Sequence, residues 1–203
     1  MPEHYFTADP NSAHDLRTVA LPCGGRVLTC QTDAGVFSRD HLDPGSALLL
    51  SALPAQVSGR VLDLGCGWGA VGLSIACLHP AAQLTLCDIN ARALTLAERN
   101  FAQNRLSAEF ACGDGLAAVE GCFSLIATNP PIRAGKAVIY RLFAESRARL
   151  VPGGMLLVVI RKQQGAPSAL AHLKTLFDEA QVVARGGGYW VIRCVVSPQG
   201  ETT

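Results

Sequence analysis

The sequence has no long hydrophobic run. Its longest apolar stretch, residues 155–160, has the length of a buried strand, whereas a membrane-spanning helix needs roughly 18 to 20 apolar residues. The polar residues 1–15 lack the charged segment followed by an apolar segment that marks a secretory signal. Nothing in the chain therefore directs it to a membrane or out of the cell, and we expect a cytoplasmic protein.

Charged residues are also scarce. They make up 16% of the 203 residues, against 49% hydrophobic residues, which leaves enough apolar surface for a large core and excludes a disordered chain. The net charge of +1 does not by itself indicate a nucleic-acid partner. Between positions 129 and 165, however, a single acid, Glu145, accompanies a group of basic residues: Arg133, Lys136, Arg141, Arg147, Arg149, Arg161 and Lys162. This cluster suits a polyanionic partner, although a solvated helix face explains the same charges equally well.

The cysteines and histidines lack the spacing of metal ligands. None of the eight cysteines forms a Cys-x-x-Cys pair, and the five histidines are scattered singly. Most of the cysteines lie in apolar segments, so buried free thiols in a reducing compartment explain them better than disulfides or zinc. We expect no metal site.

Strand-like and helix-like segments alternate along the chain. The apolar runs expected to be strands of one sheet are residues 61–64, 83–87, 108–111, 123–128 and 155–160. Helices are expected at residues 70–78, after the capping residue Asn90, at 136–150 and at 168–180, and Asp43 or Ser46 could cap another that runs to about residue 53. The segment Pro152-Gly153-Gly154 is expected to end the helix at 136–150. Strands that are apolar on both faces and separated by helices imply a parallel sheet covered on both sides.

Two hairpins complete the predicted fold. Residues 182–185 and 189–196, joined by three glycines, predict an antiparallel hairpin at the sheet edge, and residues 17–21 and 26–32 predict another near the N-terminus. The expected fold is a Rossmann-like, doubly wound, mostly parallel seven-stranded α/β sheet with a C-terminal antiparallel hairpin and an N-terminal β-hairpin extension. We expect residues 1–55 to form that extension, packed on one compact catalytic domain of residues 56–203.

A glycine-rich turn gives the strongest local signal. Residues 61–69 read Val-Leu-Asp-Leu-Gly-Cys-Gly-Trp-Gly, so a strand runs into the turn and a helix begins immediately afterwards. Glycines let the backbone approach a ligand closely, and the start of the helix is expected to offer free N–H groups to an anion. Gly67, Gly69 and Gly72 also spell G-x-G-x-x-G, the pattern of nicotinamide dehydrogenases.

Three aspartates distinguish between the two cofactors that such a turn can hold. Asp63 lies inside the strand before the turn, Asp88 ends the next strand, and Asp114 follows the third. S-adenosylmethionine carries an ammonium and a sulfonium, so acids at three successive strand ends suit it better than they suit a pyrophosphate. Asp88 and Asp114 could each also be ordinary helix caps. Taken together, the acids favour an S-adenosylmethionine-dependent methyltransferase over a dehydrogenase.

The segment Asn129-Pro130-Pro131-Ile132 follows the fourth strand of the sheet. Its two prolines fix a rigid turn, which is expected to direct the Asn129 side-chain oxygen and the Pro130 carbonyl into the crevice beside the aspartates. Two convergent acceptors can hold both hydrogens of an exocyclic amino group and direct its nitrogen lone pair at a methyl donor. A simpler interpretation is a Pro-Pro turn that only ends a strand.

The two motifs together resemble class I methyltransferases that modify planar amino groups. Four segments are more specifically similar to the catalytic domain of the small-subunit ribosomal RNA guanine-N2 methyltransferase C family. They are His4-Tyr5-Phe6, Gly35-Val36-Phe37-Ser38, the Asn-Pro-Pro-Ile-Arg-Ala-Gly-Lys stretch at 129–136, and the Gln-Gly-Ala-Pro-Ser stretch at 164–168. The resemblance runs nearly end to end.

The resemblance implies roles for particular residues. Those implied to bind the cofactor are Asp63, Gly65, Cys66, Gly67, Gly69, Asp88, Ile89, Asp114, Gly115, Asn129 and Phe37. The glycine turn would line the methionine part, Asp88 would hold the ribose, Asp114 with Gly115 the adenine, and Phe37 would form a wall of the pocket. The catalytic segment would be Asn129, Pro130, Pro131 and Ile132, and Arg133 and Lys136 would contact RNA phosphates.

Two departures from the family change the expected recognition of the substrate. Ile132 stands where adenine- and glutamine-methylating relatives have an aromatic residue that stacks on the base, so stacking must come from elsewhere. Tyr5, Phe6 and Tyr189 are the candidates, although packing in the core or at the surface explains each of them better. The bacterial enzymes of the family also carry an additional N-terminal domain that these 203 residues do not include. A guanine in paired RNA would have to be flipped out of its helix.

The predicted function is methylation of a guanine N2 amine in the RNA of the small ribosomal subunit, with S-adenosylmethionine as the cofactor. Two alternatives remain beside it. One is N-methylation of a small molecule or a protein glutamine, which a deep closed pocket would favour. The other is a cofactor-binding or RNA-binding module without catalytic activity, against which the intact Asn129-Pro130-Pro131 segment argues.

Overall fold

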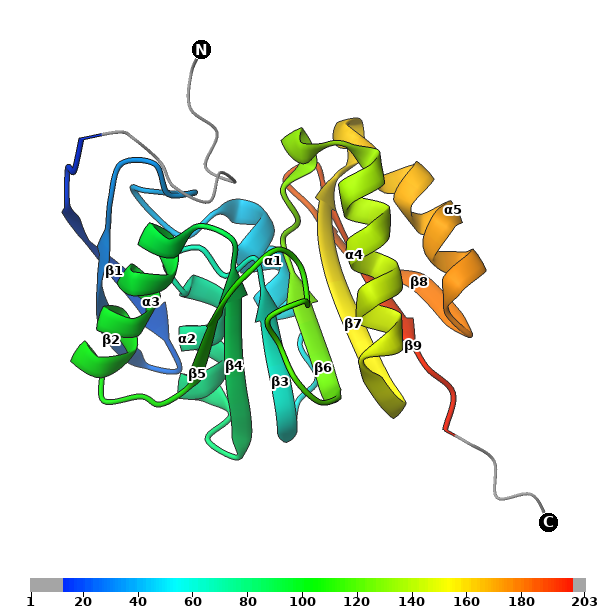
Figure 1. The fold of residues 1–203 in the computed structure, drawn as a ribbon, viewed down its shortest axis with the longest axis horizontal. Helices are drawn as coiled ribbons and strands as arrows, with labels where there is room; N and C mark the ends of the chain where they lie inside the picture. The colour runs from blue at the N-terminus through cyan, green and yellow to red at the C-terminus, as the bar shows by residue number, and fades with distance from the viewer. Residues whose placement is uncertain (1–12, 199–203) are drawn as a thin grey trace.

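A mixed seven-stranded sheet forms the centre of the molecule (Figure 1). Its strands are β3 (Gly59–Leu64), β4 (Ala82–Asp88), β5 (Glu109–Cys112), β6 (Phe123–Thr128), β7 (Leu150–Arg161), β8 (Glu179–Gly186) and β9 (Tyr189–Val195). In the computed structural model, which describes residues 13–198, they lie in the order β5-β4-β3-β6-β7-β9-β8. Neighbours from β5 to β7 are parallel, whereas β9 runs antiparallel to both β7 and β8. The predicted sheet with its C-terminal antiparallel hairpin is confirmed.

Helices cover both faces of this sheet. One face carries α1 (Pro44–Ser51), α2 (Ala70–Leu78) and α3 (Ala91–Gln103), and the other carries α4 (Lys136–Ala148) and α5 (Ala166–Leu176). Along β7, Leu157 and Val159 belong to the core on the first face, whereas Leu156 and Val158 belong to the core on the second. Successive side chains of a strand point to opposite faces, so a strand that is covered twice is apolar throughout.

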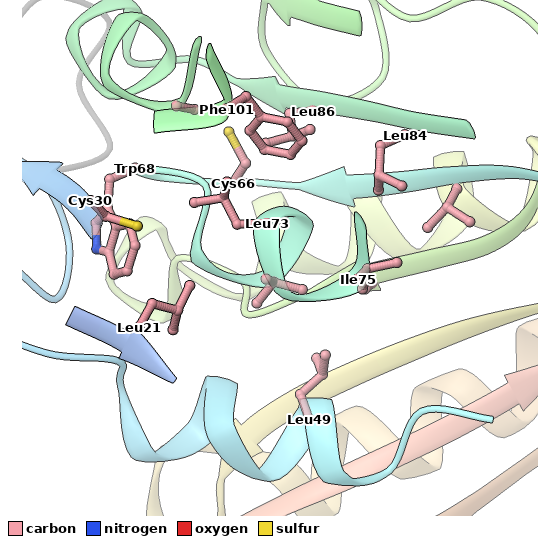
Figure 2. Close-up of a cluster of buried hydrophobic side chains, with 14 of the residues drawn as sticks. Leu21, Cys30, Leu49, Cys66, Trp68, Leu73, Ile75, Leu84, Leu86 and Phe101 are labelled. Atoms are coloured by element: carbon pink, nitrogen blue, oxygen red, sulfur yellow. The ribbon is translucent and has the colours of Figure 1, made fainter. Parts of the chain in front are cut away.

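The N-terminal hairpin forms a separate two-stranded sheet beside α3 (Figure 1). It consists of β1 (Arg17–Cys23) and β2 (Arg26–Thr32), joined by Gly24 and Gly25, which both have positive φ. Its inward side chains, such as Leu21 and Cys30, are buried in one cluster with Trp68 (Figure 2). The predicted N-terminal β-hairpin is therefore also confirmed.

Asn100 of α3 and Asn104, the residue that follows the end of this helix, attach the hairpin to the domain. The Asn100 side chain accepts a hydrogen bond from the Gln31 backbone N–H (2.6 Å) and donates to the Gln31 carbonyl (2.9 Å) and the Trp68 carbonyl (2.9 Å). One turn later, Asn104 bonds the N–H (3.1 Å) and the carbonyl (2.9 Å) of Thr29. The two amides thus bond the backbone N–H and C=O groups of Thr29 and Gln31 at the outer edge of β2, as a neighbouring strand would.

Two predicted boundaries are wrong. Pro152-Gly153-Gly154 does not end a helix, because α4 already ends at Ala148 and the segment lies inside β7. The pairing of β6 with β7 shifts register between Phe123 and Leu125, which accommodates this irregular strand. The helix expected at 168–180 is α5 (Ala166–Leu176), and Ala180 belongs to β8. None of the helices within residues 13–198 has the length and hydrophobicity needed to cross a membrane.

Asn100→Ala is expected to lower the free energy of unfolding by about 3 kcal/mol, because it leaves buried backbone groups of Gln31 and Trp68 without partners. The matched variant is Asn104→Ala, whose contacts with Thr29 are exposed, and it should lose about 1 kcal/mol. Urea denaturation followed by circular dichroism measures both. Equal losses in the two variants would contradict the assigned role of Asn100.

Candidate functional site

A cavity of about 360 Å³ opens at the carboxyl ends of β3, β4 and β6. The chain builds the sheet outward from β3 in both directions, and ligands of open α/β sheets bind where the strand order reverses in this way. The predicted site residues that line the cavity are Asp63, Gly65, Cys66, Gly67, Asp88, Ile89, Asp114, Gly115, Asn129, Pro131 and Phe37. The other predicted residues are not in its lining: Gly69, Pro130, Ile132, Arg133 and Lys136.

Gly65 and Gly67 leave space that a side chain would fill. Their φ angles of +73° and +56° lie in the left-handed region, which L side chains rarely adopt. A Cβ added to either would meet no protein atom within 4 Å. Since both residues line the cavity, a larger residue there would occupy room that is available to a ligand.

Four N–H groups of the glycine turn already have acceptors within the protein. Gly65 and Cys66 both donate to the Cys87 carbonyl (2.8 and 3.0 Å), and Gly69 donates to the Cys66 carbonyl (3.0 Å). The N–H of Gly67 donates to Asp88 Oδ2 at 2.8 Å. Because these groups are satisfied within the protein, they cannot cradle a pyrophosphate, and this argues against the dehydrogenase alternative.

Gly69 and Gly72, the last two glycines of the G-x-G-x-x-G pattern, allow α2 to pack closely against its neighbours. A Cβ on Gly69 would lie 3.1 Å from the Ala97 Cβ of α3. A Cβ on Gly72 would approach Leu86 at 3.0 Å and Asp63 Oδ2 at 3.2 Å. They let α2 lie close to α3 and to the sheet, rather than lining the cavity.

Asp63 is the most deeply buried acid of the site, with 2% of its surface exposed. Its Oδ2 accepts from the Gly72 N–H at 2.8 Å, which ties β3 to the first turn of α2. Burial raises the pKa of Asp63, the Gly72 bond lowers it, and the charge of Asp88 raises it; the net result is a pKa of about 7 against the ordinary value of 3.8.

Asp88 holds the glycine turn from the neighbouring strand. One carboxylate oxygen accepts from Gly67 and the other from the Asn90 N–H (2.9 Å). Burial raises the pKa of Asp88, and the backbone donors lower it. Asn90, not Asp88, caps α3 by accepting from the Ala93 N–H, so the interpretation of Asp88 as a helix cap is wrong.

Asp114 stands at the outer side of the cavity in an ion pair. Its carboxylate accepts from Arg141 Nη2 at 2.7 Å, while Arg141 Nη1 donates to Glu145 at 2.8 Å. The pKa of Arg141 is raised by these two acids. Residues 115–122 form no helix, so Asp114 is not a helix cap either.

Asn129 is held by two residues that the sequence did not reveal as part of the site. Its Nδ2 donates to Asp43 Oδ2 (3.0 Å) and to Ser46 Oγ (3.1 Å), both of which line the cavity. The sequence predicts Asp43 and Ser46 only as alternative caps of a helix. They lie 86 and 83 residues from Asn129, so no local spacing could connect them with it.

Ile132, Arg133 and Lys136 lie outside the lining of the cavity, whereas Pro131 is part of it. Ile132 begins the short 3₁₀ turn η1 (Ile132–Ala134) and lies with Lys136 and Ile160 around a second, much smaller cavity. Arg133 and Lys136 are exposed at this edge of the molecule.

One of the three predicted stacking residues, Tyr189, is within the described residues. The Arg161 guanidinium lies 4.9 Å from the centre of its ring, so one face of the ring is already covered. Tyr5 and Phe6, the other predicted stacking residues, and His4 lie outside the described residues.

The wall of the cavity opposite the glycine turn comes from the loop before α1. Trp68 Nε1 donates to the Ser38 carbonyl at 3.1 Å, and this bond holds the loop that carries Phe37. Phe37 lines the cavity while 37% of its surface remains exposed. The aromatic ring therefore stands at the opening, where a bound ligand would cover it.

The charge of the lining fits S-adenosylmethionine. Four acids, Asp43, Asp63, Asp88 and Asp114, line the cavity with one basic side chain, Arg141, and apolar walls surround them. Such a lining favours a cationic ligand that also has an apolar body, and it disfavours a phosphate. No group of three His, Cys, Asp or Glu side chains within residues 13–198 is arranged to hold a metal ion.

Fold and site together define a Rossmann-like methyltransferase. Residues 27–193 match the family described as methyltransferase small domain, and the chain belongs to that family, whose cofactor is S-adenosylmethionine. The YbxB protein of Bacillus subtilis, which is described as uncharacterized, is 38% identical over 95% of this chain and 98% of its own length. Ribosomal RNA small subunit methyltransferase C of Pasteurella multocida is 42% identical over 71% of this chain and 42% of its own length.

A solved structure agrees with these relatives. It is the 16S rRNA N2 G1207 methyltransferase RsmC of T. thermophilus, in complex with AdoMet and guanosine. It aligns with a TM-score of 0.80 and 28% identity over 92% of this chain and 52% of its own. This chain thus spans about half the length of the methyltransferase C relatives it matches.

The titration of Asp63 predicts a pH-dependent stability. The folded protein keeps the Asp63 proton up to about pH 7, whereas the unfolded chain loses it near 3.8. The stability that this proton supplies is therefore complete below about pH 4 and is lost as the pH rises through 7. Urea denaturation without cofactor should show wild type losing stability relative to Asp63→Asn over this range. Parallel pH profiles of the two proteins would contradict the raised pKa.

Proposed function

We propose that this chain transfers a methyl group from S-adenosylmethionine to the exocyclic N2 amine of a guanine in small-subunit ribosomal RNA. The observation that carries the proposal is the orientation of Asn129 at the cavity. Its Nδ2 is occupied by Asp43 and Ser46, which leaves Oδ1 as the acceptor for a substrate N–H. The methyltransferase C relatives and the guanosine-bound structure supply the substrate class.

The residues of the chain position the amine rather than activate it. Asn129 Oδ1 accepts one of its hydrogens, and this directs the nitrogen lone pair toward the methyl group. When bound, S-adenosylmethionine supplies an electrophilic methyl group on a sulfonium. The nitrogen needs no base at the moment of transfer, since its proton can leave to water afterwards.

In this proposal the cofactor contacts follow the sequence expectation. Gly65, Cys66 and Gly67 line the methionine part, Asp88 holds the ribose, and Asp114 with Gly115 lies at the adenine. Asp63 acts indirectly, because its hydrogen bond to Gly72 fixes the glycine turn. Gly69 shapes the packing of α2 and does not contact the ligand.

RNA binding is assigned to the edge of the molecule beside the cavity. Arg133 and Lys136 are exposed there and carry the phosphate contacts. In this proposal residues 56–203 are the catalytic domain and residues 1–55 its extension, whose described part, from residue 13 on, contributes Phe37, Asp43 and Ser46 to the cavity. A ribosomal RNA substrate would place the protein in the cytoplasm.

The test is tritiated methyl transfer from S-adenosylmethionine to RNA and ribosomal subunits from a strain that lacks the gene. Incorporation into the small-subunit RNA, recovered as N2-methylguanosine, is the expected result. Asn129→Ala should abolish transfer and leave the cofactor affinity measured by calorimetry nearly unchanged, because its assigned contacts are to the amine. Cofactor binding without any incorporation into RNA would reject the ribosomal substrate and direct the search to small molecules and proteins.

The RNA edge predicts a particular salt dependence. Replacing Arg133 and Lys136 by alanine should reduce the slope of log affinity for RNA against log salt concentration by about 0.7 to 0.9 for each phosphate that the variant no longer neutralises. Lys174→Ala is the matched control, since this exposed lysine lies in the last turn of α5 and does not line the cavity. Filter binding at several salt concentrations measures the slopes, and the assignment is wrong if all variants keep the wild-type value.

A further inference from the structure

Asn129 depends on α1 for the direction of its side-chain amide. Both of its Nδ2 hydrogens have acceptors, Asp43 Oδ2 at 3.0 Å and Ser46 Oγ at 3.1 Å. A flipped amide would place Oδ1 against the Asp43 carboxylate, and two acceptors without a hydrogen between them repel each other. The carboxylate therefore determines which end of the amide remains available to a substrate.

The acceptors are themselves fixed in place. Asp43 is 9% exposed and Ser46 is 6% exposed. The Asp43 oxygen that binds Asn129 also accepts from the Ser46 N–H at 3.0 Å, so the same atom caps α1. The Asp43 carbonyl meanwhile accepts from the Ala47 N–H at 2.9 Å, which begins the helix.

The two residues between Asp43 and Ser46 make this arrangement possible. Pro44 occupies the first turn of α1, where its missing N–H removes no helix hydrogen bond. At Gly45 a Cβ would lie 2.8 Å from Asp43 Oδ2 and 2.8 Å from Tyr189 Cε1. Glycine therefore allows the carboxylate, the tyrosine ring and the start of the helix to meet in one place.

We propose that Asp43 and Ser46 are positioning residues that orient Asn129 for the acceptor amine, so that the start of α1 is part of the catalytic apparatus. This rests on the proposed function, because it concerns the same amine. The negative charge of Asp43 beside the Asn129 NH₂ group also polarises the amide and strengthens Oδ1 as an acceptor. The substrate nitrogen becomes more positive as it binds the methyl group, so a stronger acceptor favours the transition state.

Ser46→Ala is the cleanest test. It removes one acceptor of the Asn129 amide but keeps the backbone N–H that Asp43 caps, so the helix start is retained. The thermal midpoint, the cofactor affinity and KM for RNA should stay at wild-type values, while kcat falls about 2- to 10-fold, the effect of one hydrogen bond. The control is Ser51→Ala on the same helix, whose hydroxyl donates to the Leu48 carbonyl and does not contact Asn129.

Substitutions of Asp43 separate positioning from capping. Asp43→Ala removes both the cap and the acceptor, so its midpoint and kcat should both fall. Asparagine is as good a cap as aspartate and can place an oxygen at the same point, so Asp43→Asn should recover the midpoint and most of kcat. A kcat for Ser46→Ala and Asp43→Ala equal to that of Ser51→Ala would overturn the proposal.

A measurement on the protein without RNA keeps this proposal distinguishable from the proposed function. The side-chain amide protons of Asn129, assigned by their absence in Asn129→Ala, should exchange slowly with water in wild type and rapidly in Asp43→Ala. Slow exchange in wild type that becomes rapid in Asp43→Ala supports the orienting role of Asp43. This holds even if no RNA accepts a methyl group, a result that would reject only the proposed function. Rapid exchange in wild type would overturn the orienting role.

Discussion

The hydrogen bonds that hold the glycine turn and the first turn of α2 to the buried Asp63 and the half-buried Asp88 are the constraint on which the rest of the site depends. Asp63 and Asp88 come from neighbouring parallel strands; Asp63 accepts the Gly72 N–H in the first turn of α2, and Asp88 accepts the Gly67 N–H in the glycine turn. They fix where β3 ends and how the helix begins, so they fix the shape of the cavity. The arrangement keeps two carboxylates away from water, which raises the pKa of both. A cationic ligand would favour their charged forms, so binding and folding are coupled at the same atoms.

The structure joins a second part of the chain to that centre. Asn129 follows β6 on the sheet, while Asp43 and Ser46 belong to the segment before the sheet begins. The same early segment supplies Phe37, whose loop is attached to the glycine turn through Trp68. Beyond it, the hairpin is held by Asn100 of α3. The early segment is therefore a structural part of the cavity, which explains why the family match already begins at residue 27, within β2.

The sequence predicted the strands and the strand-end acids because both depend on short-range or topological rules. Residues 123–128 and 70–78 match β6 and α2, since a strand-like or helix-like apolar run is visible in a local window. Acids after successive parallel strands had to meet at one edge of the sheet. The hydrogen bonds from Gly65 and Cys66 to the Cys87 carbonyl were not predictable from a local window, because this acceptor comes from the neighbouring strand. The contact of Asn129 with Asp43 spans 86 residues, and no local pattern contains it.

Charge separates two regions that the proposed reaction would use differently. The cavity presents acids and the acceptor oxygen of Asn129, so it repels phosphates and takes a group that donates N–H. The neighbouring edge presents Arg133 and Lys136, which attract phosphates. A nucleic acid could satisfy both regions only if its backbone stays at the edge while a single base enters the cavity. Among the bases, one that offers an exocyclic amine to Oδ1 fits, and the unstacking this requires is easiest for a nucleotide that is already unpaired.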